Sequence, residues 1–118
     1  MIIYTDQQKA DHARGIIEHI AALNKEMKTN IHRAFNSPLV QWAIKRGDES
    51  AAHFYLADFY QSQQWRIAAA RDWYRKFNDP DYYDTAAIRA AVVKIERDFD
   101  MGFAYDQYLI DRAFGKAI

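Results

Sequence analysis

The side chains best suited to hold a metal ion are the four histidines, His12, His19, His32 and His53. Ligands on one helix must stand three or four residues apart, because only those positions lie together on one face. His12 and His19 are seven residues apart, which separates them by about 10 Å along a helix axis. The sequence has no His-x-x-x-His or Glu-x-x-His pair. We therefore expect no metal site, and nothing indicates a cofactor.

Two clusters of carboxylates raise the question of calcium binding. Asp79, Asp81 and Asp84 surround a proline, and Asp98 and Asp100 lie shortly before a glycine. A calcium loop needs oxygen ligands at alternate positions, a glycine at the sixth position and a glutamate at the twelfth. Neither cluster has this spacing, so we interpret both as turn-forming and helix-capping residues.

The sequence also lacks the usual motifs of catalysis. It has no Gly-x-Ser-x-Gly motif and no glycine-rich phosphate loop, because its four glycines are isolated from one another. A pair of carboxylates for acid and base catalysis cannot be chosen from sixteen acidic residues without a pocket. We therefore expect that the protein is not an enzyme.

One segment, residues 65–77, combines basic and aromatic side chains of the kind found at binding hot spots. The candidate partner-binding residues of this segment are Arg66, Arg71, Tyr74, Arg75 and Lys76. A second interpretation is a solvated face whose arginines pair with nearby carboxylates. Phe54 is a further candidate, since it points away from Leu56 on the expected helix. It is either sandwiched between neighbouring helices or an exposed anchor for a partner.

The elements that must position these residues are all predicted to be helices. Thr5 and Gln8 resemble a capping box at the start of the first helix, which we expect to extend to about Lys28. Gly102 is expected to interrupt the last helical segment. The pattern of apolar residues and caps predicts helices over residues 5–28, 37–47, 48–60, 65–77, 84–102 and 104–113. The expected fold is an all-α, compact single-domain bundle of five to six helices with short loops.

The central segment suggests how two of these helices pair. Leu56-Ala57-x-x-Tyr60, followed by Ala69 and Trp73, resembles the alternation of small and large residues in a tetratricopeptide repeat. The run Trp73-Tyr74-Arg75-Lys76 is similar to the end of a Sel1-like repeat. The resemblance covers residues 50–77 only, and it implies a helical hairpin of the kind used for protein recognition. An ordinary helical hairpin, with alanines packed against Trp73, is the other interpretation.

Composition limits the class of protein. The chain has 118 residues, which predicts a single helical domain over residues 1–118. Half of the residues are hydrophobic and none is cysteine, which indicates a globular protein without disulfides or cysteine-based metal sites. We see no signal peptide and no apolar stretch long enough to span a membrane, so we expect a cytoplasmic protein with no membrane partner.

These observations favour a non-enzymatic protein–protein interaction module. Such a module would bind another protein through Tyr, Trp and Arg surfaces. It would act as an adaptor, a subunit or a small inhibitor, for example as an accessory protein of a phage or plasmid. The alternative is a nucleic-acid-binding helical protein that uses a local basic patch, although a net charge of zero does not favour bulk binding to phosphate.

A homodimer is a further expectation, because the charge is unevenly distributed along the chain. Residues 1–47 carry seven basic and four acidic residues, a net charge of +3. Residues 78–118 carry five basic and eight acidic residues, a net charge of −3. Two copies could therefore pair head to tail through their oppositely charged ends.

Overall fold

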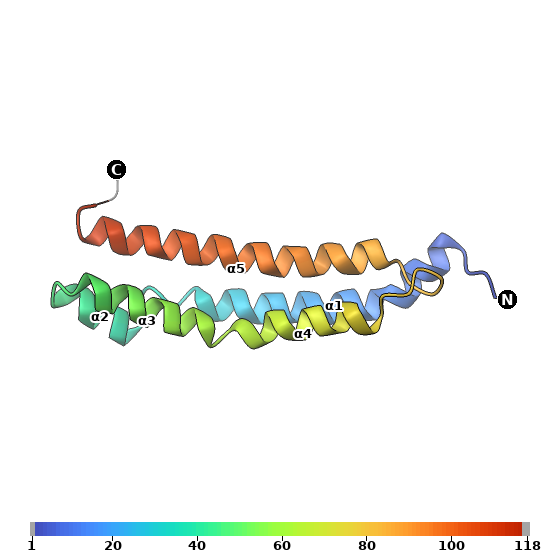
Figure 1. Cartoon of the computed structure of the whole chain (residues 1–118), viewed down its shortest axis with the longest axis horizontal. Coiled ribbons are helices and arrows are strands. Elements are labelled where there is room, and N and C mark those ends of the chain that lie inside the picture. The colour runs from blue at the N-terminus through green and yellow to red at the C-terminus, as the bar shows by residue number, and fades with distance from the viewer. Residues whose placement is uncertain (1, 117–118) are drawn as a thin grey trace.

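The structure, a computed structural model, describes residues 2–116 and contains only helices and their connections (Figure 1). No strand occurs within these residues, so the all-α prediction is confirmed. The helices are α1 (Asp6–Ile31), α2 (Pro38–Lys45), α3 (Glu49–Gln61), α4 (Gln64–Lys76) and α5 (Thr85–Ala113). None of them is long and apolar enough to cross a lipid bilayer.

The molecule is elongated, and the prediction of a compact bundle is therefore wrong. Its Cα atoms extend over 66 × 25 × 17 Å, with a radius of gyration of 18.6 Å. A compact domain of this length would have a radius of gyration of about 13 Å. The cause is the length of α1 and α5, which have 26 and 29 residues and lie side by side over most of their length. Long straight helices that pack side by side produce a rod.

Because α3 and α4 lie end to end as one interrupted helix, the described residues form four helical units, and the predicted five to six are not supported. Three of these units form the framework. α1 forms one rod, α3 followed by α4 forms a second, and α5 forms the third (Figure 1). α1 and α5 run in the same direction, and the α3–α4 rod runs back between their ends. α4 packs against both α1 and α5, whereas α3 packs against α5 and α2.

α3 and α4 do not form the hairpin that was predicted for residues 50–77. They lie end to end, joined by Ser62 and Gln63 (Figure 1). Ser62 has φ −63° and ψ −16°, and Gln63 has φ −96° and ψ −7°, so both remain near the right-handed helical region. Such residues interrupt a helix without reversing the chain. The pair of antiparallel helices that a tetratricopeptide-like repeat implies is therefore absent from this segment.

The helical hairpin of this protein is formed by α2 and α3 instead, and Gly47 makes its turn. Gly47 has φ +72°, a conformation that other residues rarely adopt. Its N–H donates to the Ile44 carbonyl at 3.0 Å, and the Asp48 N–H donates to the Ala43 carbonyl at 3.0 Å. This is a Schellman motif, which satisfies the last carbonyls of α2 and reverses the chain.

Most helix starts follow the sequence signals. The capping box of Thr5 and Gln8 is present at the start of α1. The Asp48 carboxylate accepts from the Ala51 N–H, and the Asp84 carboxylate accepts from the Ala87 N–H. Ser37 precedes α2 but makes no side-chain cap. These caps fix where α1, α3 and α5 begin, and therefore which face of each helix meets the core.

Gly102 does not interrupt α5, contrary to the prediction. It lies inside a continuous helix, where a Cβ atom would come within 2.8 Å of Ile31 Cδ1 and 3.3 Å of the Tyr60 hydroxyl. The glycine therefore allows α1 and α3 to approach α5 closely. For a separate last helix over residues 104–113, the apolar spacing predicts that Tyr105 faces inward. In the continuous helix, Tyr105 and Tyr108 are both exposed.

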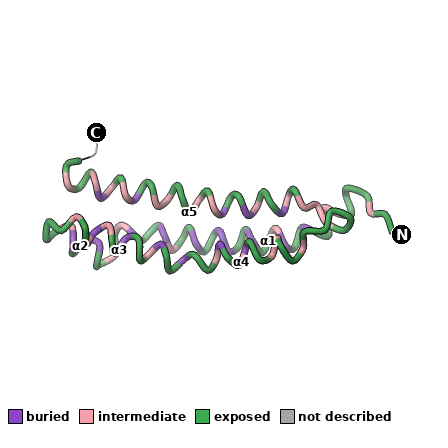
Figure 2. The backbone as a smooth tube through the Cα atoms, viewed as in Figure 1, coloured by how far each residue is buried: buried purple, intermediate pink, exposed green. Residues whose placement is uncertain are grey.

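The buried core runs along the long axis of the molecule, between the helices (Figure 2). The spacing of apolar residues in the sequence predicts a buried stripe along α1 and another along α3. Both are observed, with Ala13, Ile16, Ile20, Leu23 and Met27 buried in α1 and Ala52, Leu56 and Tyr60 buried in α3. In α2, the spacing of apolar residues predicts a buried stripe of Leu39, Trp42 and Ala43. The structure buries Val40 and Ala43 instead and exposes Leu39 and Trp42. The fully buried large side chains come from α1, α2, α3 and α5: Ile20, Met27, Val40, Leu56, Tyr60, Ile88, Ile95 and Ile110.

Candidate interaction surfaces

An exposed group of apolar side chains lies on the α2–α3 hairpin, and we call it the aromatic surface. Phe54 is 67% exposed, Leu39 54% and Trp42 47%. Tyr55, which is half-buried, links Trp42 and Phe54, since its ring centroid lies 6.5 Å from that of Trp42 and 5.7 Å from that of Phe54. The Arg46 guanidinium stacks on Trp42, 4.3 Å from the ring centroid. The aromatic surface consists of Leu39, Trp42, Arg46, Phe54 and Tyr55.

The aromatic surface arises because the buried residues of α2 and α3 determine which side chains of each helix face the solvent. In α2, burial of Val40 and Ala43 turns Leu39 and Trp42 outward. In α3, burial of Ala52, Leu56 and Tyr60 leaves Phe54 on the opposite face, as its position relative to Leu56 indicated. The turn at Gly47 then brings the two outward faces together. The structure thus places Phe54 at the surface, not between helices.

Three of the four basic residues predicted to bind a partner, Arg66, Arg71 and Arg75, are engaged in ion pairs. Arg71 lies 2.6 Å from the Glu96 carboxylate of α5, and Arg75 lies 2.9 Å from that of Asp72. Arg66 contacts Glu26 at 3.3 Å, and its side chain is only 13% exposed. This agrees with the interpretation of a solvated, paired face. Tyr74 is half-buried, and Lys76 lies beside the Phe77 ring.

Phe54 and these basic residues do not form one surface, because α3 and α4 lie end to end. Arg66 stabilises the connection between α3 and α4 through a hydrogen bond to Gln63. The buried Gln63 side-chain oxygen accepts from Arg66 Nη1 at 2.5 Å and from Asn30 Nδ2 at 3.0 Å. The break between α3 and α4 is therefore fastened to α1 by hydrogen bonds.

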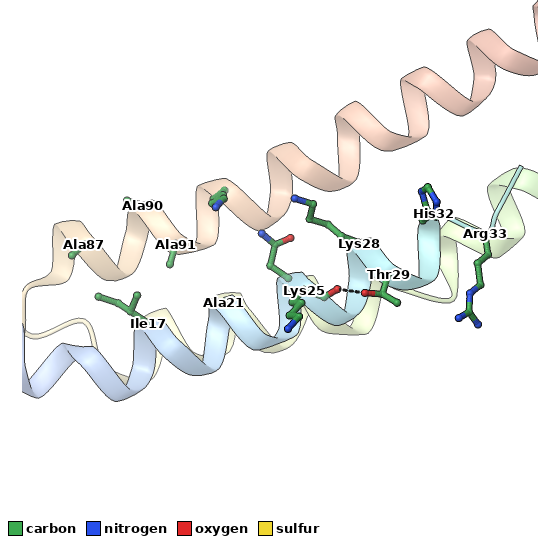
Figure 3. Close-up of a pocket in the computed structure, with 12 residues that line it drawn as sticks. Ile17, Ala21, Lys25, Lys28, Thr29, His32, Arg33, Ala87, Ala90 and Ala91 are labelled. Atoms are coloured by element: carbon green, nitrogen blue, oxygen red, sulfur yellow. Dashed lines mark hydrogen bonds between the residues drawn. The ribbon is translucent and has the colours of Figure 1, made fainter.

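A groove of about 850 Å³ lies between α1 and α5 (Figure 3). One end is apolar and the other end is basic. The apolar end is lined by Ile17, Ala21, Ala87, Ala90 and Ala91. The rest of the lining is polar or charged, comprising Asn24, Lys25, Lys28, Thr29, His32, Arg33 and Lys94.

Asn24 has an unsatisfied acceptor in this groove. Its Nδ2 donates to the Asp98 carboxylate at 2.8 Å, and its Oδ1 is buried without a hydrogen-bond partner. Leaving a buried acceptor unpaired costs about 1–3 kcal/mol. Lys28 lies 3.8 Å from the same Asp98 carboxylate. Within residues 2–116, Asn24 Oδ1 is the single buried side-chain polar atom that has no hydrogen-bond partner.

Sequence reasoning did not find the groove. The available signal was the run of small residues at positions 86–87 and 90–91 of one helix, which leaves room beside it. That signal is ambiguous, because alanines more often mark a close helix contact. The groove becomes visible only once α1 and α5 are known to be neighbours.

One histidine meets other possible metal ligands. His53 lies 3.1 Å from Asp111 and 3.9 Å from Glu49, and one ligand atom of each residue falls within 4.8 Å of the others. Glu49 and His53 stand four residues apart on α3, a Glu-x-x-x-His spacing that places both on one face of the helix. Lys116 already pairs with Glu49 at 2.7 Å, and this hydrogen bond raises the pKa of Lys116. The group is therefore explained as an ion-pair network between α3 and the end of α5.

The other histidines are separate from this group. His12 Nδ1 lies 3.0 Å from the Tyr82 carbonyl, and His19 packs against the Trp73 ring at 4.5 Å between centroids. His32 lines the groove between α1 and α5. Each histidine thus has a different neighbourhood.

A buried polar pair links α3 to α5. The Tyr60 hydroxyl donates to the Asp106 carboxylate, and both residues are buried. Burial and the neighbouring carboxylate raise the pKa of Tyr60, so its hydroxyl stays protonated. Burial also raises the pKa of Asp106, although the hydrogen bond from Tyr60 opposes this effect. A protonated phenol held by a buried carboxylate is suited to fastening two helices.

Comparison with known proteins adds no relative. No family model, curated protein or solved structure matches the chain. The function must therefore be argued from the surfaces described above.

Proposed function

We propose that the protein is a non-enzymatic protein-interaction module that binds its partner through the aromatic surface of the α2–α3 hairpin. The supporting observation is the exposure of Trp42 and Phe54, whose rings both neighbour Tyr55, together with exposed Leu39 three residues before Trp42 on the same face of α2. Exposing large apolar side chains side by side is unfavourable in water and is typical of surfaces that bind other proteins.

Arg46 specifies part of the partner's chemistry. Its guanidinium carbon lies over the Trp42 ring, so this contact defines the position of the charge before binding. Trp, Tyr and Arg are the residues most enriched at binding hot spots. The partner surface that fits this arrangement is an apolar pocket with a carboxylate at its edge, where it would pair with Arg46. Adaptor, subunit and inhibitor roles are all ways of using such a contact.

Nucleic-acid binding has less support. The basic patch of this alternative would consist of Lys45, Arg46, Arg66, Arg71, Arg75 and Lys76. Of these six residues, Arg66, Arg71 and Arg75 pair with carboxylates of the same chain, which reduces the positive charge available to phosphates. The remaining three are Lys45, Arg46 and Lys76, and Arg46 stacks on Trp42. These ion pairs do not favour the alternative.

The test is affinity purification from native-host lysate with a tagged protein, in the presence of nuclease, followed by calorimetry with the purified partner. Trp42→Ala and Phe54→Ala should each weaken binding at least tenfold, as expected for hot-spot residues. Trp65→Ala is the matched control, because Trp65 is 55% exposed but lies on α4, outside the aromatic surface.

Three outcomes would contradict the proposal. The first is a partner bound equally well by the wild type and by both hairpin variants. The second is bound material that nuclease removes, which would favour nucleic acid. The third is a dimeric mass in light scattering that Trp42→Ala converts to a monomer, which would assign the surface to a second copy of this chain.

A further inference from the structure

The groove between α1 and α5 is a second surface, separate from the aromatic surface, and its lining changes character along its length. Figure 3 shows Ile17, Ala21, Ala87, Ala90 and Ala91 at one end and Lys28, Thr29, His32 and Arg33 toward the other. A ligand that fits this lining has an apolar part and an anionic part. The order of the two parts along the ligand is set by the order of the residues along α1.

The charge of the basic end is largely unneutralised. Among residues 2–116, Lys25, Arg33 and Lys94 have no carboxylate within 4.0 Å, in contrast to Arg66, Arg71 and Arg75 of α4. Lys28 is the exception, because its ammonium lies 3.8 Å from the Asp98 carboxylate, which also accepts from Asn24. The basic end is therefore complementary to more than one negative charge.

Asn24 requires the ligand to carry a hydrogen-bond donor in addition to negative charge. Its side chain is 7% exposed, and its Oδ1 lacks a donor. Turning the amide over would place Oδ1 against the Asp98 carboxylate, so the hydrogen bond from Nδ2 fixes the orientation. The ligand should therefore bring an N–H or O–H donor to the middle of the groove, between its apolar and anionic parts.

We propose that this groove binds an extended acidic peptide, whose apolar residues lie on the alanines and whose acidic residues face Lys28 and Lys94. An extended peptide has free backbone N–H groups, one of which would donate to Asn24 Oδ1. A helix offers none outside its first turn, because its other N–H groups are used internally.

The size and composition of the lining agree with this ligand. From Ile17 to Arg33 the groove follows α1 for about 24 Å, which corresponds to about seven extended residues. Alanine side chains let a peptide backbone come close to α5. The lining contains no Phe, Tyr or Trp on which a nucleic-acid base would stack, so a peptide fits better than a single-stranded oligonucleotide.

The experiment measures fluorescence anisotropy of two labelled peptides, Ile-Val-Ala-Gly-Asp-Glu-Glu and the same residues in reverse order. One order should bind with a micromolar Kd, and the other at least fivefold more weakly. A neutral version, with Asn and Gln in place of Asp and Glu, should bind at least tenfold more weakly than its acidic counterpart.

Variants locate the binding. Lys28→Glu combined with Lys94→Glu should weaken binding at least tenfold. The matched control is Lys76→Glu combined with Arg112→Glu, an equal charge change at two exposed residues that do not line this groove. That control should bind within twofold of the wild type. Trp42→Ala should also bind the peptide like the wild type, because Trp42 lies on the aromatic surface and not in the groove. Loss of peptide binding and loss of partner binding at the aromatic surface can therefore be distinguished.

A spectroscopic readout tests the role of Asn24. In ¹⁵N-labelled protein, the side-chain amide signals of Asn24 should shift on peptide addition. Asn24→Leu should lose at least fivefold in affinity while the circular dichroism spectrum stays helical.

The proposal is overturned if neither peptide order binds at millimolar concentration, or if both variant pairs weaken binding equally. It is also overturned if an eight-nucleotide oligothymidylate displaces the peptide with the same affinity as an acidic peptide. That result would show a site for polyanions in general.

Discussion

The Tyr60 hydroxyl and the Asp106 carboxylate form a buried hydrogen bond that joins α3 to α5. The rings of Phe99 and Phe103 pack beside Tyr60, with centroids at 5.4 and 4.9 Å. Gly102 leaves room for the hydroxyl, since a Cβ atom there would lie 3.3 Å from it. The pair therefore depends on a small residue one turn before Asp106 on the same helix.

Tyr60→Phe should lower the free energy of unfolding by about 1–3 kcal/mol, because it keeps the ring but leaves a buried carboxylate without its donor. Chemical denaturation at pH 7 measures the change. Tyr105→Phe removes a hydroxyl from an exposed tyrosine and should change stability by less than about 0.5 kcal/mol. Equal effects of the two substitutions would contradict the role of the pair.

Asp106 predicts a pH dependence of stability. Its pKa is raised in the folded protein, so the folded state binds more protons than the unfolded state as the pH rises above the ordinary value of about 4. The associated stability is fully present below that pH and is lost as the pH rises through the folded pKa.

Asp106→Asn removes this titration. The stability of the wild type relative to Asp106→Asn should therefore fall between pH 4 and pH 7, as measured by urea unfolding at both values. A relative stability that rises over this range would show that the pKa is lowered on folding.

Gly102 and Gly15 allow a matched comparison within long helices. Gly15→Ala should raise the free energy of unfolding by about 0.5–1 kcal/mol, because a Cβ atom there meets nothing within 4 Å and alanine favours the helix. Gly102→Ala should be destabilising by about 1 kcal/mol or more, because its Cβ atom would overlap Ile31 Cδ1 in the core. Thermal unfolding followed by circular dichroism distinguishes them, and an equal rise in Tm would rule out close packing at Gly102.

Gly47 should tolerate asparagine better than alanine. Its φ of +72° lies in the left-handed region, where alanine costs about 1–2 kcal/mol. Asparagine adopts this region more readily, so Gly47→Asn should lose less stability than Gly47→Ala. Urea unfolding curves of the two variants test the order, and equal midpoints would argue against a Schellman turn between α2 and α3.

The features that could be predicted from the sequence are local ones. Thr5 with Gln8, Asp48 and Asp84 cap helices because each acts on backbone groups within three residues. The buried stripes of α1 and α3 follow from spacing along a single helix. Such features do not depend on which helices become neighbours.

The features that could not be predicted depend on packing between distant segments. Ser62 and Gln63 carry no signal that distinguishes a reversal from a continuation, whereas Gln63 is bound by Asn30, more than thirty positions away. In the sequence, Gly102 resembles a helix breaker, whereas in the structure it makes room for Ile31 and Tyr60. The unpaired Asn24 acceptor likewise appears only when Asp98 is brought beside it. Local signals in the sequence therefore predict the helices but not which helices pack against one another.

The elongation of the molecule places the aromatic surface and the α1–α5 groove at different positions along one rod 66 Å long. A target that carried both an apolar pocket and an acidic segment would meet them at a fixed spacing. The second contact would then form within a complex already tethered by the first, at an effective concentration in the millimolar range. Two individually weak contacts would become a tight one through avidity, and a target with the wrong spacing would bind through only one of them.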